Sequence, residues 1–163
     1  MIRQASASQL LGQTEPRPLR TVSARPEVAR SPEVGMSLRE FLPTIDWAKN
    51  GRTLVLVVST QCHYCIDSVP FYREIQEEVG NTVKLVAVLP QPVPEGREFL
   101  DRGGVHVDDV KEAPLRTMKV RGTPTLLFAN SAGTVTDLWE GKIPPQQENQ
   151  VLAVLKSDRR ERP

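Results

Sequence analysis

The sequence has little of several features that mark common protein classes. Its 163 residues include only two cysteines, which excludes a small secreted scaffold held by several disulfides. It has 21 lysines and arginines against 20 aspartates and glutamates. This balance gives no general field that would attract nucleic acid or anionic lipid, so we expect no nucleic-acid partner. The longest apolar run, Leu54–Val58, is far shorter than the roughly 20 residues of a membrane span, and we expect no membrane segment.

The chain is expected to divide into an arm, one domain and a tail. Residues 1–35 hold four prolines, five arginines and no aromatic residue. They bury too little apolar surface to offset their ordering entropy, which predicts a flexible N-terminal arm. Residues 36–157 alternate strand and helix signals and are expected to form the domain. The charged residues 158–163 are expected to form a solvated tail.

The N-terminal sequence bears on the cellular location of the protein. It has no apolar stretch of signal-peptide length, because Leu10-Leu11 stands alone. As written, the chain is therefore expected to be cytoplasmic. A start codon further upstream would instead allow a periplasmic or membrane-tethered protein, and both alternatives stay open.

Hydrophobic periodicity predicts an α/β domain with a mixed sheet. Short apolar runs predict buried strands, and apolar residues at three- or four-residue steps predict helices. The predicted strands cover 54–59, 83–89, 105–110, 125–129 and 134–140. The predicted helices cover 63–79, 95–102, 113–118 and a last segment that begins at Pro144-Pro145. Helical crossovers would cover the central sheet on both faces, a closing hairpin would add antiparallel strands at one side, and a C-terminal helix would end the domain.

The long helix 63–79 is expected to present one buried face. The apolar residues that define this face are Ile66, Val69, Tyr72, Ile75 and Val79. Pro70 lacks an N–H group and is expected to kink the helix. Gly80-Asn81 is expected to end it.

The two cysteines, Cys62 and Cys65, lie where the first strand meets the long helix. Unpaired N–H groups and the dipole at a helix N-terminus favour a negative charge, so Cys62 is expected to ionise more easily than a free thiol of pKa ~8.5. Cys65 is expected to be more buried and within disulfide reach of Cys62. Cys62 would then attack a disulfide and Cys65 would resolve the mixed disulfide, which needs no cofactor.

Two other uses of the cysteines fit less well. Structural zinc needs four ligands, and the chain offers the two cysteines with His63 and His106 at most. His63 stands between the cysteines, where ligation is awkward, so no metal is expected. Inert buried cysteines would leave their position at a strand–helix junction unexplained.

A second motif, Gly122-Thr123-Pro124-Thr125, precedes the fourth strand. A strand, a CxxC pair and a helix, followed about 60 residues later by Gly-Thr-Pro-Thr, a hairpin and a terminal helix, resemble the thioredoxin-like superfamily. Residues 54–71 and 120–141 are most similar to bacterial TlpA-like and redoxin-domain thiol-disulfide proteins. The resemblance covers 36–157 and implies a thioredoxin-like fold.

The resemblance also implies an activity and a set of site residues. It implies a thiol-disulfide oxidoreductase with protein dithiol or disulfide substrates and an upstream redox partner, and we expect a monomer. Cys62 and Cys65 would be catalytic. Pro124 would be a cis-proline beside them, and Thr123 would offer backbone groups to a bound peptide.

The chain also departs from the family pattern. Gln61 stands where the family usually has Trp, and Leu56 stands where thioredoxins carry a buried carboxylate. His63 and Tyr64 replace the Gly-Pro of general reductases and are candidate redox-tuning residues. A protonated His63 would stabilise the Cys62 thiolate, or it would only face solvent. Tyr64 is expected to pack near the substrate groove.

Two other functions remain as alternatives. A peroxiredoxin-like peroxidase shares the fold, but residues 59–62 lack the Pro-x-x-x-Thr/Ser-x-x-Cys arrangement of that family. A non-catalytic thioredoxin-fold binding module would use the arm or a metal. The sequence also leaves open whether the pair reduces or oxidises its substrates.

Overall fold

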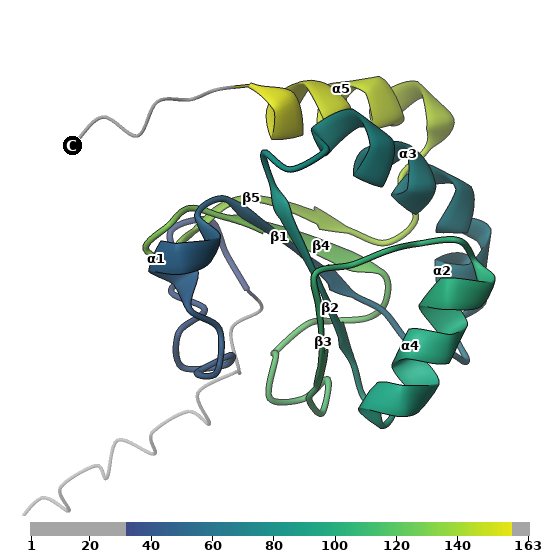
Figure 1. The fold of residues 1–163 in the computed structure, drawn as a ribbon, viewed down its shortest axis with the longest axis horizontal. Coiled ribbons are helices and arrows are strands. Elements are labelled where there is room, and N and C mark those ends of the chain that lie inside the picture. Colours follow the sequence, from purple (N-terminus) through teal and green to yellow (C-terminus); the bar gives the residue numbers. More distant parts are fainter. Residues whose placement is uncertain (1–31, 158–163) are drawn as a thin grey trace, which may run out of the picture.

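The computed structural model describes residues 32–157. Most of the predicted arm and the whole predicted tail lie outside these residues. The five strands form one mixed sheet in the order β3-β2-β1-β4-β5 (Figure 1). The strands are β1 (Thr53–Val57), β2 (Lys84–Leu89), β3 (Asp109–Glu112), β4 (Thr125–Ala129) and β5 (Val135–Glu140). Strands β1, β2 and β3 pair in parallel, β4 pairs antiparallel with β1, and β5 pairs antiparallel with β4, which confirms the predicted α/β class with a mixed sheet.

Helices cover the sheet and connect its strands. They are α1 (Trp47–Asn50), α2 (His63–Asp67), α3 (Val69–Val79), α4 (Val93–Arg102) and α5 (Pro145–Lys156). Over residues 32–157, no helix has both the length and the apolar character needed to cross a membrane.

Strand β1 is the centre of the sheet. It pairs in parallel with β2 and antiparallel with β4, and all five of its residues are buried. A strand covered on both faces is expected to be apolar throughout, as Leu54 to Val57 are. The chain leaves the carboxyl end of β1 and enters the turn that carries Cys62.

One face of the sheet packs against α3 and α5, which lie side by side over it in Figure 1. The hydrophobic core between this face and the helices forms one cluster of buried residues. It includes Leu54 and Leu56 of β1, Tyr72 of α3, and Cys65. Leu100 of α4 belongs to the same cluster. The second cysteine is therefore part of the core on this face.

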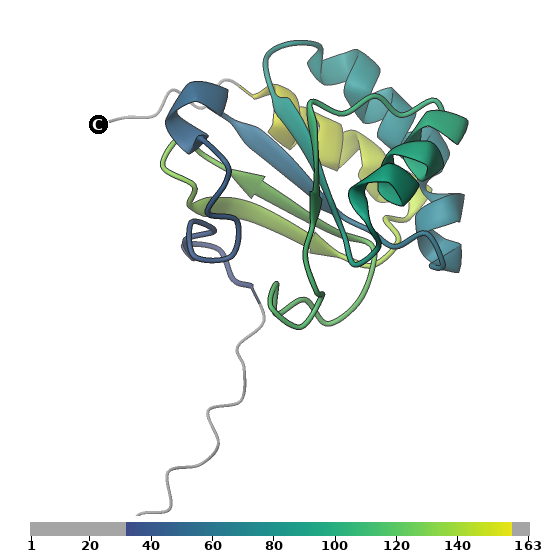
Figure 2. The same cartoon turned by 60° about the horizontal axis from the view of Figure 1, so that its bottom comes forward.

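The opposite face is covered by segments that carry little regular structure. Leu38, Leu42 and Trp47 pack against Val55 and Val57 from this side. In Figures 1 and 2, α1 and the loop before it lie apart from α3, α4 and α5. Helix α1 has only four residues and shows no periodicity, so no pattern in the sequence predicts it.

Two predicted elements after α4 are wrong or displaced. The predicted strand 105–110 lies instead at Asp109–Glu112. Residues 113–118 form no helix, and turns occupy 115–119. The Thr117 N–H and hydroxyl both donate to the Pro114 carbonyl, at 2.9 and 2.6 Å, and Lys119 has a φ of 53°. These contacts close a turn where the predicted helix would continue.

The predicted helix 63–79 is divided at Ser68 into α2 and α3. Pro70 has no N–H group for the Ile66 carbonyl, which explains the break near the predicted kink. The prediction that Ile66 is buried is wrong, because its side chain is 52% exposed. Cys65 takes the inward position of this turn, and Ile66 follows it on the outer side.

Candidate active site

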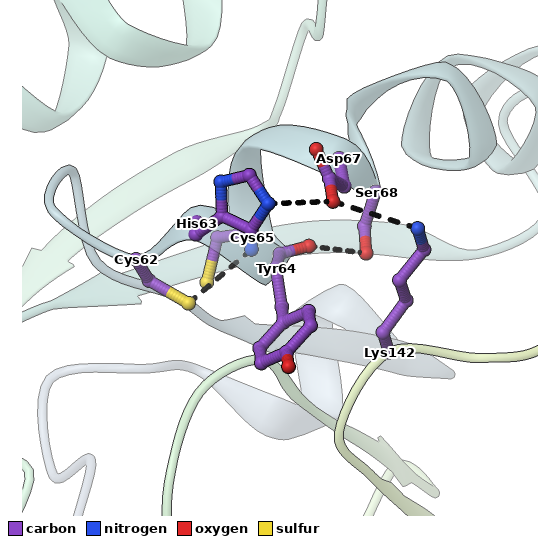
Figure 3. Close-up of polar contacts among 7 residues, drawn as sticks. All are labelled: Cys62, His63, Tyr64, Cys65, Asp67, Ser68 and Lys142. Atoms are coloured by element: carbon purple, nitrogen blue, oxygen red, sulfur yellow. Dashed lines mark hydrogen bonds and ion pairs between the residues drawn. The ribbon is translucent and has the colours of Figure 1, made fainter.

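Cys62 is the N-cap residue of α2, directly after the turn that follows β1. Its N–H donates to the Ser59 carbonyl at 3.2 Å, which fixes that turn. Its Sγ atom accepts the Cys65 N–H at 3.2 Å (Figure 3). Both cysteines are free thiols, with Cys62 half-buried and Cys65 buried.

Two opposing influences act on the Cys62 thiol. Burial raises its pKa, but hydrogen bonds from Cys65, from the Thr123 side chain and from the Tyr64 backbone outweigh burial, so the pKa lies below the ordinary value of 9.0. The Cys65 N–H favours the thiolate because it can donate to a charged sulfur. The Thr123 carbonyl accepts from the protonated Sγ at 3.3 Å and favours the thiol. The net direction makes Cys62 the more acidic of the two cysteines.

Cys65 has the opposite electrostatic environment. Its side chain is fully buried, and burial raises its pKa to about 12, with the hydrogen bond and charge of Cys62 acting in the same direction. The Ser59 backbone and Thr123 lower the pKa but do not balance these effects. The pair therefore combines a thiol that ionises with one that keeps its proton.

The segment 121–124 lies against this pair. The Thr123–Pro124 peptide bond is cis, and the Thr123 carbonyl is the atom that Cys62 contacts. The Thr125 hydroxyl donates to the Gly122 carbonyl at 2.8 Å, and the Gly141 N–H donates to the Pro124 carbonyl at 2.8 Å. The fold thus brings Cys62, Cys65, Thr123 and Pro124 to one place.

His63 turns toward Asp67 (Figure 3). Its Nε2 atom lies 3.2 Å from Asp67 Oδ2, and Lys142 Nζ lies 3.6 Å from the same oxygen. The His63 side chain is 79% exposed, and the groups that shift the Cys62 pKa do not include it. The i,i+4 spacing of His63 and Asp67 could have predicted their contact. Lys142 lies in a loop far along the chain, so local spacing could not have predicted its contact with Asp67.

Tyr64 lies beside the cysteines with its ring exposed. The side chain is 59% exposed, and the ring meets that of His63 edge-on, with 5.8 Å between their centroids. Its carbonyl accepts the Ser68 hydroxyl at 2.6 Å. Together with Ile66, it places two exposed apolar side chains on α2, next to the polar side chains of His63 and Asp67.

Gln91, which the sequence analysis missed, ties the turn before Cys62 to the loop after β2. Its Oε1 atom accepts the Thr60 N–H at 3.2 Å, and its Nε2 atom donates to Ser59 Oγ at 3.0 Å. The Thr60 hydroxyl also contacts Glu95 Oε1 at 3.0 Å. Adjacent parallel strands end at the same edge of a sheet, so the residues that follow β1 and β2 are expected to lie close together. This expectation could have indicated the contacts of Gln91.

Within 32–157, no group of three or more His, Cys, Asp or Glu side chains is arranged to hold a metal ion.

Comparison with known proteins gives a family and a set of similar folds. The profile of the thioredoxin-like domain family matches residues 46–156. A thiol:disulfide interchange protein from Bacteroides sp. is 13% identical, with a TM-score of 0.56 and coverage of 71% of this chain and 80% of that chain. A thiol-disulfide isomerase from Corynebacterium glutamicum is 18% identical, with a TM-score of 0.53 and coverage of 66% and 82%.

A thioredoxin family protein from Chlorobium tepidum, also described as a thiol:disulfide interchange protein, is 15% identical. Its TM-score is 0.53, with coverage of 66% of this chain and 81% of that chain. At these identities the similarity establishes the fold. No curated protein sequence matches the chain.

Proposed function

The chain belongs to the thioredoxin-like domain family, and we propose that it is a thiol-disulfide oxidoreductase acting on protein substrates. The observation that carries this proposal is the asymmetry of the two thiols. Cys62 is accessible and has a lowered pKa, whereas Cys65 is buried and has a pKa of about 12. Disulfide exchange by a CxxC pair needs such a division between a thiol that attacks and one that resolves.

In the reducing direction, the Cys62 thiolate attacks a substrate disulfide. One Sγ–S bond forms, the substrate S–S bond breaks, and one substrate sulfur leaves as a thiolate. Cys65 then loses its proton and attacks Cys62 Sγ, so that the Cys62–Cys65 disulfide forms and the second substrate sulfur leaves. The two electrons pass from the dithiol to the substrate, and the substrate sulfurs take up the two protons. The oxidising direction is the reverse.

Thr123 and Pro124 are proposed to hold the substrate chain. Cys62 Sγ and the Thr123 carbonyl lie 3.3 Å apart, so a peptide whose sulfur is bonded to Cys62 must pass close to the Thr123 backbone. A strand-like peptide could pair with that backbone, as in other cases of strand addition. The exposed Tyr64 and Ile66 would then lie within reach of apolar substrate side chains.

The direct test is the reduction of insulin by dithiothreitol with and without the protein. We expect the wild-type chain to accelerate it and Cys62→Ser to give only the rate of dithiothreitol alone. Cys65→Ser should instead trap a mixed disulfide between Cys62 and the substrate, which mass spectrometry detects. Equal acceleration by wild type and Cys62→Ser would refute the proposal. Consumption of hydrogen peroxide without insulin reduction would favour a peroxidase.

A further inference from the structure

A buried polar face continues from Cys65 into the core. Cys65, Ser68 and Tyr72 stand at positions i, i+3 and i+7, which share one side of a helix. Their exposed fractions are 0%, 6% and 2%. The other fully buried members of the cluster that contains Cys65 and Tyr72 are aliphatic residues and phenylalanines. A serine and a tyrosine in such surroundings require an explanation.

The Tyr72 hydroxyl is the unexplained group. It is buried and has no hydrogen-bond partner within residues 32–157, although buried hydroxyls normally have one. The Ser68 hydroxyl, on the preceding turn, donates to the Tyr64 carbonyl at 2.6 Å; its oxygen could still accept, but no hydrogen bond from the Tyr72 hydroxyl to it has ordinary geometry. Burying a hydroxyl without a partner costs folding free energy, so phenylalanine would serve the core better. The hydroxyl therefore has no evident role in stabilising the fold.

The position of the hydroxyl points to Cys65. Helical side chains point back toward the N-terminus, so the Tyr72 ring extends over the turn of Ser68 in the direction of Cys65. Burial, and then the charge of an ionised Cys65, raises the pKa of Tyr72 above its ordinary value, although the nearby Ser68 side chain acts in the opposite direction. The phenol therefore keeps its proton when Cys65 loses its own, and it can act as a hydrogen-bond donor but not as a base.

Other groups around Cys65 fill this role only in part. Leu56 of β1, in the same core cluster, has no ionisable group. Cys62 is the titratable group that raises the pKa of Cys65, while the Ser59 backbone and the Thr123 side chain lower it through hydrogen bonds without balancing burial. Once Cys62 is bonded to a substrate sulfur, it no longer carries a charge that opposes ionisation of Cys65. A donor from the core side would then stabilise the thiolate directly.

We propose that the Tyr72 hydroxyl donates a hydrogen bond to the Cys65 thiolate while Cys65 attacks or leaves Cys62. This inference rests on the proposed disulfide exchange. Tyr72 keeps its proton throughout, and the proton that Cys65 loses passes to the departing substrate sulfur. Because the same thiolate forms in both directions, the hydroxyl assists reduction and oxidation alike.

The test separates the two exchange steps with one equivalent of dithiobis(nitrobenzoate), an aromatic disulfide that releases a coloured thiolate. Attack by Cys62 on the reagent releases the first thiolate, and attack by Cys65 on the mixed disulfide releases the second. We expect Tyr72→Phe to leave the first phase unchanged in stopped flow and to slow the second about tenfold, the effect of one hydrogen bond to a charged group. The rise of the second-phase rate with pH should also move to higher pH.

A structural role would give a different result. Phenylalanine keeps the ring, so we expect the oxidised Tyr72→Phe variant to be at least as stable to heat as the wild type. Trp47→Phe removes the other buried polar atom that lacks a partner in the described region, on the opposite face of the sheet, and should leave both phases unchanged. An unchanged second phase and pH profile in Tyr72→Phe, or equal slowing of both phases, would overturn the inference.

Failure of the proposed function would look different. The wild type would then release a single thiolate, as Cys65→Ser is expected to do, and no disulfide would form between Cys62 and Cys65. If Tyr72→Phe releases two thiolates with the same kinetics as the wild type, the proposed disulfide exchange stands and only the proposed role of Tyr72 is refuted.

Discussion

The different ionisation of the two cysteines predicts how fast each reacts with iodoacetamide. The pKa of Cys65 is raised from 9.0 to about 12, which corresponds to about 4 kcal/mol at about 1.4 kcal/mol per pKa unit. At pH 7 about 1 in 100,000 Cys65 thiols would be ionised, against about 1 in 100 for a thiol of pKa 9.0. Because the thiolate is the reactive form and the Cys62 pKa is lowered, Cys62 should react at least about 1,000 times faster.

Single-cysteine variants measure each thiol separately. Cys65→Ser keeps only Cys62 together with the backbone N–H that donates to it, and Cys62→Ser keeps only Cys65. Burial is the largest cause of the raised Cys65 pKa, so Cys65 should stay slow even without Cys62. Alkylation at pH 7, followed by mass spectrometry, gives the two rates. Similar rates for the two variants would refute the electrostatic argument.

Other predictions concern the surroundings of the site and the fold. Gln91→Leu removes two hydrogen bonds to the turn before Cys62 and should lower the free energy of unfolding by about 1–3 kcal/mol in urea. Gly133→Ala should lower it by about 2–4 kcal/mol, because Gly133 has a φ of +78° and its added Cβ would lie 3.0 Å from the Trp47 ring. The reduced protein should lose stability as the pH rises from 9 toward 12, because folded Cys65 holds its proton more tightly than the unfolded chain does. The disulfide form, unfolded in urea at the same pH values, should lose less stability, because Cys65 no longer ionises there and only the raised pKa of Tyr72 still acts in this direction.

Each of these expectations can fail on its own. Unchanged unfolding of Gln91→Leu would mean that the turn before Cys62 is held by other contacts. A neutral Gly133→Ala would mean that the Trp47 ring moves freely. An equal loss of stability at high pH in the reduced and disulfide forms would assign that loss to groups other than Cys65.

The sequence predicted the site best where the signal is local. The CxxC pair could be placed because an apolar run ends just before it and a helical pattern starts just after it. The hairpin of β4 and β5 was also predictable, because an Asn-Ser-Ala-Gly turn separates two apolar runs. The distance between Cys62 and Thr123 in space was implied only by the family resemblance, because the two residues are 61 positions apart in the chain.

The errors arose where tertiary contacts or turns override local periodicity. Residues 113–118 have helical spacing, but the bonds of Thr117 to the Pro114 carbonyl close a turn instead. Ile66 fits an unbroken helix, but the division at Ser68 places it in solvent. The burial of Tyr72 was predicted correctly. The missing hydrogen-bond partner of its hydroxyl could be recognised only from the packing of the core around it.

The contacts made by Gln91 and Lys142 could not be derived from local sequence patterns. Each reaches the site from a loop that follows a strand, and each is positioned by the pairing of strands rather than by its own neighbours. The packing of residues 38–45 against the sheet could not be derived from local sequence patterns either. These residues lie before the region that the family profile matches, and yet Leu38 and Leu42 pack against the sheet. We therefore propose that the domain begins near residue 36.

Equilibration of the protein with glutathione redox buffers tests the exchange chemistry most directly, with the Cys62–Cys65 state read by mass spectrometry after acid quenching. We predict one reversible two-electron transition, with a potential between about −270 and −120 mV, the range from reductases to strong oxidants. Cys65→Ser should show no such transition and should form only a mixed disulfide with glutathione at Cys62. A wild-type protein that stays a dithiol across the whole range, or that never closes a Cys62–Cys65 disulfide, would contradict the proposed activity.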